Sequence, residues 1–268
     1  MSRAFAPAQN EYLQLSSSPL TPYPLVMGCW FKTNNAGLTQ NLMNLGASTS
    51  AHNFSLHISS FNGTARCHSE GGIISEAQTS NTWSANTWQL AIGVWANVSS
   101  RIIYLNGSAS SGNSGASVTV SGVNRFRIAQ EADSSTGSRS TFSGSIAEAF
   151  IANVVPTTTQ INQLWNGGSG GAGLSPDQVF GVNLISWWKL LASDGSIDYD
   201  GTNHLLEINT PTNGADHPNI DYGSSGSSIP RFRHHYRNQG FMRHSQSGLW
   251  LPPGVEDQLL RFNHRGES

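Results

Sequence analysis

Apolar and polar residues alternate over short stretches of the chain, which is the pattern of β-strands with one buried face. Residues 88–95 place their apolar side chains on one parity, at Trp88, Leu90, Ile92 and Val94. The next apolar run, RIIYL at 101–105, is β-branched and aromatic, and Asn106-Gly107 follows it. Both of these last residues tolerate the positive φ of a tight turn. The two runs therefore predict neighbouring antiparallel strands.

Similar short runs recur along the chain, separated by turn-forming residues. We expect further strands at 12–15, 25–31, 41–45, 54–58, 125–129, 142–153, 184–191 and 204–208. The segment 167–175, GGSGGAGLS, is expected to be a flexible loop. Many short strands with turn signals between them predict an all-β sandwich or jelly roll.

One segment, 156–168, has the pattern of a helix instead. Thr157 and Gln160 match a capping box, and Gly167 stands at the position of a C-cap glycine. One face of this helix would carry Ile161, Leu164 and Trp165. We expect a short helix packed on one end or edge of the sheets.

Composition supports a β-rich chain of 268 residues with few charges. Charged residues make up 11% of it and Gly accounts for 28 positions, whereas globular domains usually carry roughly 25% charged residues. The net charge of −2 gives no reason to expect nucleic-acid binding. No signal peptide or membrane-length apolar run is apparent in the sequence. Cys29 and Cys67 show no metal spacing, and we expect two reduced, buried thiols rather than a disulfide.

The stretch 86–107 resembles the central hairpin of laminin-G-like domains in the concanavalin A-like lectin-glucanase superfamily. In that family a Trp opens one strand and Tyr-x-Asn-Gly ends the next; here these are Trp88 and residues 104–107. The stretch 142–165 resembles the closing strand and helix of the family. The matching residues are Gly144, Ile146, Glu148, Thr157 and Ile161, whereas Ala147 stands where the family usually has Asp.

The resemblance extends over roughly residues 10–222, since WWKL at 187–190 and DYDG at 198–201 resemble the tail of longer members. It implies an all-β fold, an antiparallel β-sandwich of the concanavalin A-like jelly-roll type, here with one short helix and an extended C-terminal arm. We expect a jelly-roll domain over 1–222 and a linker with a basic, aromatic arm over 223–268. The fold itself hosts lectins, glycosidases, adhesion modules and structural proteins, so it does not settle the function.

Catalysis is not expected. Glucanases of this superfamily place their carboxylates as Glu-x-Asp-x-x-Glu on one strand, and glycoside hydrolysis needs a pair of them. Glu148 is alone on its strand, with Ala147 where an Asp could stand. We expect Glu148 to make a structural hydrogen bond or ion pair. Two glycine motifs, at 167–171 and 168–173, follow a helix rather than a strand, so we interpret them as loop sequence.

No cofactor is expected, although Ca²⁺ is a possible ligand of the acidic loop 194–200. The candidate carboxylates are Asp194, Asp198, Asp200 and Asp216, whose spacing is not that of an EF-hand. Solvated turn residues are the simpler interpretation. The nine His show no zinc-site spacing, so no metal site is predicted from them.

Exposed aromatic rings can stack on sugars, which makes the Trp residues candidates for glycan binding. The four considered are Trp83, Trp187, Trp188 and Trp250. Trp187 and Trp188 are neighbours on a strand and must point to opposite faces. We favour a core or interface position for both, and no carbohydrate-binding residue is assigned.

The last residues, 226–268, carry 6 Arg and 3 acidic residues and interleave Arg with large apolar side chains. A solvated, disordered tail would hold fewer aromatic residues. We interpret this segment as an arm that docks on a neighbouring subunit. Its anchors would be Phe232, Tyr236, Phe241, Trp250, Leu251 and Leu259. Nucleic-acid binding by this arm is the weaker interpretation.

These observations favour a non-catalytic structural or decoration protein of a bacteriophage-like virion with a lectin-like domain. Its partners would be other virion subunits or further copies of itself, and its location the virion. The step to a virion is an analogy, because laminin-G-like domains recur in phage structural proteins. The first alternative is a carbohydrate-binding or adhesion module, with a cell-surface glycan as partner. The second alternative is a glycoside hydrolase.

Overall fold

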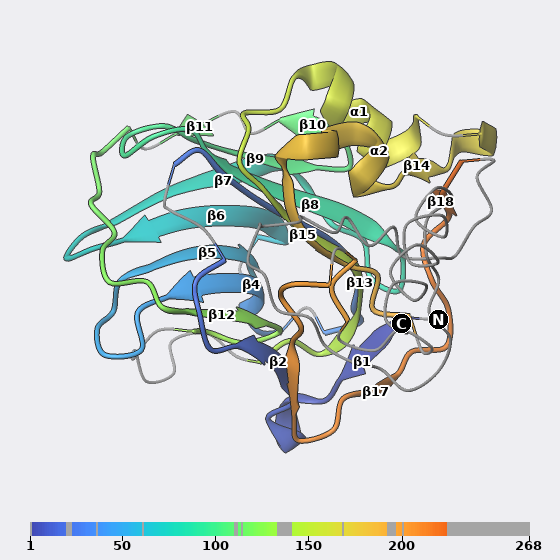
Figure 1. Ribbon diagram of the computed structural model, residues 1–268, viewed down its shortest axis with the longest axis horizontal. Helices are drawn as coiled ribbons and strands as arrows, with labels where there is room; N and C mark the ends of the chain where they lie inside the picture. Colours follow the sequence, from blue (N-terminus) through green and yellow to red (C-terminus); the bar gives the residue numbers. More distant parts are fainter. Residues whose placement is uncertain are drawn as a thin grey trace, which may run out of the picture. The chain divides into compact units, whose positions relative to one another are not determined.

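The computed structural model describes residues 2–19, 23–35, 37–60, 62–109, 112–113, 115–132, 141–167, 169–191, 197–199 and 201–223. All of these residues belong to the unit Met1–Phe232. Two antiparallel sheets, called sheet A and sheet B below, pack face to face in this unit, as Figure 1 shows. The predicted all-β sandwich is therefore confirmed.

Sheet A is organised around its longest strand, β13. In spatial order the sheet contains β10 (Ser108–Ala109), β9 (Arg101–Leu105), β8 (Gln89–Trp95), β3 (Leu25–Lys32), β13 (Gly144–Ala152), β1 (Arg3–Phe5) and β17 (Thr212–Asn213), and β15 (Leu184–Trp188) also pairs with β13. One edge of β13 pairs with β3, and the other edge is shared by β1 and β15. The strand is thus paired on both sides.

Sheet B has eight strands like sheet A, and all eight follow one continuous order. Its strands, again in spatial order, are β11 (Gly112–Asn113), β7 (Ile74–Thr82), β6 (Thr64–Glu70), β5 (Asn53–Ile58), β4 (Gln40–Gly46), β12 (Arg125–Ile128), β2 (Tyr12–Leu15) and β16 (Leu206–Ile208). A further short parallel pair joins β14 (Gly173–Leu174) to β18 (Ile220–Asp221). Because β16, β17 and β18 follow β15 in the chain, the segment 206–221 adds strands to all three sheets.

The shared core lies between the two sheets and uses alternate side chains of each. Its aromatic members include Phe31 and Trp95 from sheet A and Phe54 and Phe126 from sheet B, all without exposed surface. Cys29 and Cys67 are also in this core as free thiols, as predicted. Strand residues of one parity therefore form this core. In β8 the apolar residues of the predicted buried face, Leu90, Ile92 and Val94, lie instead on the outer side of sheet A, and the strand is buried on both faces.

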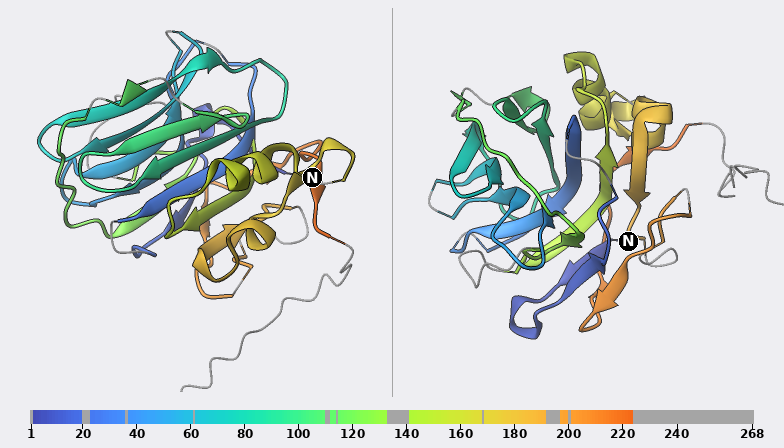
Figure 2. Two further views of the ribbon diagram at one scale, coloured as in Figure 1. Left: turned by 90° about the horizontal axis from the view of Figure 1, so that it is seen from above. Right: turned by 60° about the vertical axis from the view of Figure 1, so that its left-hand side comes forward.

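Two short α-helices lie on the outer side of sheet A, away from sheet B (Figure 2). The predicted one is α1 (Thr158–Asn166), and its capping box between Thr157 and Gln160 is formed. The second, α2 (Pro176–Phe180), was not expected. It is explained by a second capping box, Ser175 to Gln178, with Pro176 in the first turn. Short 3₁₀ turns occur at Pro7–Gln9, Ser169–Gly171 and Gly181–Asn183, the second of them inside the expected loop.

The pair Trp187 and Trp188 is buried on opposite sides of β15, as predicted. Trp188 belongs to the core between the sheets and stacks on Phe126 with 5.2 Å between ring centroids. Trp187 belongs to a second apolar cluster on the outer side of sheet A, together with Phe180. Trp83 is buried as well. None of these three rings is an exposed platform for a sugar.

Candidate functional site

The outer side of sheet B is polar across six adjacent strands. One cross-strand row on this side consists, from β2 to β7, of Gln14, Arg127, Asn44, Ser55, His68 and Glu76. Two flanking rows add Asn41, His57, Arg66 and Gln78 on one side and Arg125, Asn53 and Glu70 on the other. We call these side chains together the polar face. A sheet side with this composition is unsuited to packing against an apolar layer.

The centre of the polar face is buried although every side chain there is polar. Asn44, Asn53, Ser55 and His68 have no exposed surface. Burial of such groups is costly unless they are hydrogen-bonded, and here they bond one another. Asn53 Oδ1 lies 2.9 Å from His68 Nε2 and accepts from Asn44 Nδ2 at 3.4 Å. The backbone N–H of Ala132 donates to Asn44 Oδ1 at 3.1 Å, so the chain after β12 contributes to the network.

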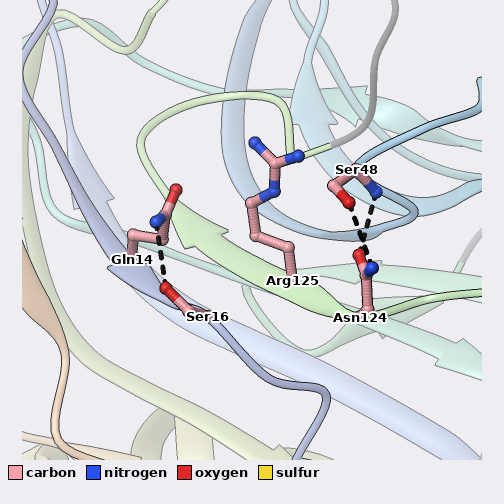
Figure 3. Close-up of a pocket in the computed structure, with 5 residues that line it drawn as sticks. All are labelled: Gln14, Ser16, Ser48, Asn124 and Arg125. Atoms are coloured by element: carbon pink, nitrogen blue, oxygen red, sulfur yellow. Dashed lines mark hydrogen bonds between the residues drawn. The ribbon is translucent and has the colours of Figure 1, made fainter.

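At the β2–β12 end of this face lies a polar pocket of about 270 Å³, which we call the rim pocket (Figure 3). It is lined by Gln14, Ser16, Ser48, Asn124 and Arg125. Two hydrogen bonds between amides and hydroxyls order its walls. Gln14 Nε2 donates to Ser16 Oγ at 3.3 Å, and Asn124 Nδ2 donates to Ser48 Oγ at 3.0 Å.

Arg125 differs from the other four lining residues. Figure 3 draws its guanidinium without a hydrogen bond to any of them. Its neighbour on the face, Arg127, is by contrast anchored, because it donates to Gln14 Oε1 at 2.9 Å and to the Glu131 carbonyl at 2.7 Å. An arginine offers a planar set of donors that suits vicinal hydroxyls or a carboxylate. No carboxylate is among the described residues that line the rim pocket.

Glu148, the candidate carboxylate of the sequence, lies on sheet A and is almost fully buried. Its carboxylate accepts from Trp187 Nε1 at 2.7 Å and from Tyr222 Oη at 2.6 Å. His217 Nε2 lies 3.1 Å from the same group. The predicted structural hydrogen bond or ion pair is thus confirmed, and the three partners include no second carboxylate.

The backbone at Glu148 is unusual for a strand. Its φ is +51°, and the pairing of β13 with β3 shifts register between Ala147 and Phe150. This is a β-bulge at the point where the second edge of β13 changes partner from β1 to β15. The bulge turns Glu148 toward the outer side of the sheet, where Trp187 and Tyr222 bind it. Glu148 therefore ties the segment after β15 to the sheet.

Lys189 is enclosed by three aromatic rings next to this carboxylate. Its ammonium lies 4.9 Å from the ring centroid of Trp187, 5.4 Å from that of Tyr199 and 4.7 Å from that of Tyr222. Cation–π attraction of this kind stabilises the contact between β15 and the later segment. The cluster is built from the chain's own side chains, so we interpret its role as structural.

The acidic residues considered for Ca²⁺ divide between two separate contacts. Asp198 is buried rather than solvated, and its two oxygens accept from the backbone N–H groups of Trp187 and Asn203 at 2.9 and 3.0 Å. Asp216 forms an ion pair with Lys32 at 2.6 Å. Asp194 and Asp200 lie outside the described residues. Ca²⁺ binding by this loop remains a prediction that these contacts do not support.

A different set of possible metal ligands comes together on the polar face. Within the ranges that the structure describes, His57, His68 and Glu76 are the group whose ligand atoms converge. Sequence reasoning missed this group because its members come from three strands and have no recognised spacing. The alternation of polar residues in 64–82 was the signal that could have revealed β6 and β7. The predicted arm residues Phe232, Tyr236, Phe241, Trp250, Leu251 and Leu259 all lie outside the described residues.

The fold and its polar face define a lectin-type β-sandwich. Residues 7–162 match the family model of the concanavalin A-like lectin/glucanases superfamily. Since this match spans more than half of the chain, the protein belongs to that superfamily. No curated protein matches the chain in sequence.

Solved structures show the same fold at low sequence identity. The native heptameric SAP-like pentraxin from Limulus polyphemus is 14% identical, with a TM-score of 0.50 over 75% of this chain and 87% of the pentraxin. A Bacteroides ovatus protein described as a carbohydrate-binding candidate is 16% identical, with a TM-score of 0.52 over 79% of this chain and 58% of its own. At these identities the likeness establishes the architecture.

The described part of the chain contains no helix that is both long and apolar enough to span a membrane.

Proposed function

We propose that this chain is a non-catalytic carbohydrate-binding domain that holds a sugar in the rim pocket. The observation that carries the proposal is the convergence of two amides, two hydroxyls and one guanidinium at the end of a polar sheet face. Sugar hydroxyls are both donors and acceptors, and amide and hydroxyl side chains match them in both roles. Membership of a lectin superfamily supports the same class of ligand.

The dimensions and charge of the rim pocket narrow the kind of glycan. Its volume of about 270 Å³ is just below the usual range of small-molecule sites, which span about 300–1,000 Å³. We therefore propose that it holds one terminal or side-chain sugar rather than a long stretch of polymer. Arg125 favours a sugar with a carboxylate, because a guanidinium binds that group through two parallel hydrogen bonds.

Absence of turnover is part of the proposal. Glycoside hydrolysis uses two carboxylates about 5–5.5 or about 6.5–9.5 Å apart, and none of the described residues that line the rim pocket is one. Glu148 is bound on sheet A by an indole, a phenol and an imidazole. We expect no hydrolysis of a polysaccharide panel, measured as released reducing ends. Turnover that Glu148→Gln abolishes would support the hydrolase alternative instead.

Binding is tested by screening the full chain on an array of neutral and acidic glycans, followed by calorimetry with the best ligand. We expect Arg125→Ala to weaken binding of an acidic glycan by at least about tenfold, the range of a charge-assisted hydrogen bond. Gln14→Ala and Asn124→Ala should weaken acidic and neutral ligands alike.

Lys32→Ala is the matched control, since it also removes one positive charge but lies on sheet A. It should leave glycan affinity unchanged. Unaltered binding by Arg125→Ala, or no binding to any glycan on the array, would contradict the proposal.

A second candidate is a structural or decoration role on a virion, with residues 223–268 as an arm that docks on another subunit. The sequence of this segment favours it, because aromatic residues interleave with six Arg. Deletion of 226–268 should abolish assembly or particle binding in sedimentation and leave glycan binding intact. Unchanged assembly after the deletion would refute the arm, including the anchoring roles of Phe232, Tyr236 and Trp250.

A further inference from the structure

Three adjacent strands of sheet B bring two imidazoles and a carboxylate together at the end of the polar face opposite the rim pocket. His57 is on β5, His68 on β6 and Glu76 on β7, and one ligand atom of each lies within 4.8 Å of the others. His68 and Glu76 are directly paired across their strands. We propose that His57, His68 and Glu76 form a binding site for a divalent transition-metal ion, Zn²⁺ in the first place.

The chemistry of this set suits zinc. Two His and one Glu are a ligand set that zinc accepts, and they leave a fourth position open for water or a ligand. With bond lengths of about 2.0–2.2 Å, tetrahedral ligand atoms lie about 3.3 Å apart. His57 Nε2 and Glu76 Oε2 are 3.5 Å apart. The remaining pair distances, at most 4.8 Å, require only side-chain adjustment on fixed strands.

Hydrogen bonds from residues that would not contact the metal orient the ring of His68. Asn53 Nδ2 donates to the carboxylate of Glu70 at 3.1 Å, which fixes the direction of the Asn53 amide. Asn53 Oδ1 can therefore only accept, so His68 Nε2, at 2.9 Å, carries the hydrogen. This tautomer has its lone pair on Nδ1, the nitrogen that a metal would use. Bound imidazoles in metal sites are held in this way by a second partner.

Arg66 would compete with a metal ion for the carboxylate of Glu76. Arg66 NH1 lies 2.8 Å from Glu76 Oε1, whereas His57 faces Oε2. One carboxylate can serve a guanidinium and a metal on different oxygens, but the two cations repel each other. Metal affinity should therefore rise when the charge of Arg66 is removed. A purely structural His57–Glu76 ion pair predicts no such gain.

Access is through Glu76. The side chains of His57 and His68 are 3% and 0% exposed, whereas that of Glu76 is 29% exposed. The open coordination position would thus face outward along β7, and the imidazoles would be shielded from solvent. The inference is independent of sugar binding in the rim pocket, because none of the three residues lines it.

The test uses the full chain, freed of metal with a chelator and titrated with zinc chloride by calorimetry. Cobalt chloride is a second probe, since tetrahedral Co²⁺ with nitrogen and oxygen ligands absorbs visible light. We expect His57→Gln and His68→Gln to weaken the tightest site at least about 100-fold, and Glu76→Gln about tenfold or more. The control His52→Gln removes an imidazole that contacts Ser121 outside the cluster, and it should change nothing.

Arg66→Gln should change zinc affinity in the opposite direction, with an expected gain of about threefold to tenfold. Glu76 and Arg66 are partly exposed, so their variants decide the question even if a His variant fails to fold. Any zinc taken up by histidines outside the described residues, such as His234 and His235, should be unaffected by these four changes. The proposal is overturned if the wild-type chain takes up no zinc, or if Glu76→Gln and Arg66→Gln both titrate like wild type.

Discussion

The outer sides of the two sheets differ in composition and in what they contact. On sheet A the outer side is apolar and covered, because α1, α2 and the segment after β15 pack on it through Ile161, Phe180 and Tyr199. On sheet B the outer side is the polar face, whose buried centre is held by side-chain hydrogen bonds such as Asn44–Asn53. Both sheets share one core between them, so the difference concerns only their outer sides.

The outer side of sheet A should contribute mainly to stability, and the rim pocket on sheet B mainly to recognition. Burial of large apolar side chains is the main favourable contribution to folding, and on the outer sides it is concentrated on sheet A. The polar face adds few apolar contacts, and its buried network gains little net free energy because its groups were hydrogen-bonded to water before folding. Substitutions on sheet A should thus act on unfolding, and those at the rim pocket on binding.

The largest effect is expected for Trp187→Ala on sheet A. Trp187 is 1% exposed and contacts Tyr199 with 4.6 Å between ring centroids. Loss of a buried Trp typically costs about 3–5 kcal/mol, so the urea midpoint should fall strongly. Trp165→Ala, a half-buried ring that stacks on Trp30, is the control and should cost less. Equal losses in the two variants would contradict the expectation that the more deeply buried ring contributes more to stability.

Glu148→Gln should have the next largest effect. The carboxylate accepts from Trp187 and Tyr222 and faces His217. An amide keeps only one acceptor oxygen and turns an N–H₂ group toward a donor, which leaves a buried polar group unsatisfied at a cost of about 1–3 kcal/mol. Asp216→Asn removes an exposed carboxylate from Lys32 and should cost below about 1 kcal/mol. Chemical denaturation of both variants checks the difference.

Elements with regularly repeating apolar residues were predicted from the sequence. Elements whose two faces both carry polar or small residues were missed. The strand with Leu90 and Ile92 and the helix with Ile161 were predicted because their apolar residues repeat regularly. Strands β6 and β7 were missed because their outer residues are polar and several inner ones, such as Ser75, are small or polar as well. The capping box of α2 was visible in the sequence and was overlooked.

The candidate site was even less predictable than the fold. The rim pocket combines Gln14 with Asn124, residues that meet only because β12 pairs with β2. His57 and Glu76 likewise meet through the pairing of three strands. Long-range register decides such contacts, and no local spacing encodes it. The positive φ of Glu148 is a further property that tertiary contacts impose against local preference.

The shared core contains one buried thiol from each sheet, and we expect both thiols to affect the pH dependence of stability equally. Burial raises the pKa of both thiols, Cys29 on β3 and Cys67 on β6. Folding then keeps each thiol protonated, whereas the unfolded thiols ionise above a pKa of roughly 8.5. Their contribution to stability is fully present below that pH and declines as pH rises above it. The slope is at most about 1.4 kcal/mol per pH unit for each thiol.

Unfolding free energies between roughly pH 8.5 and 9, about one pH unit below the ordinary pKa of tyrosine, check this slope. Cys29→Ala and Cys67→Ala should each remove about half of the thiol-dependent part, irrespective of the sheet. A slope that neither substitution reduces would show that the thiols ionise in the folded protein.

The smallest change in stability is expected at the rim pocket, for Arg125→Ala. No hydrogen bond joins Arg125 to the other lining residues, so its removal leaves none of these four side chains without a partner. Surface substitutions of this kind usually change stability by less than about 0.5 kcal/mol. The variant should thus unfold like wild type while glycan affinity falls, the reverse of Trp187→Ala, which should lose stability and keep its affinity. If Arg125→Ala unfolds as readily as Trp187→Ala, the guanidinium contributes to stability. The proposed separation of stability on sheet A from binding on sheet B would then be wrong.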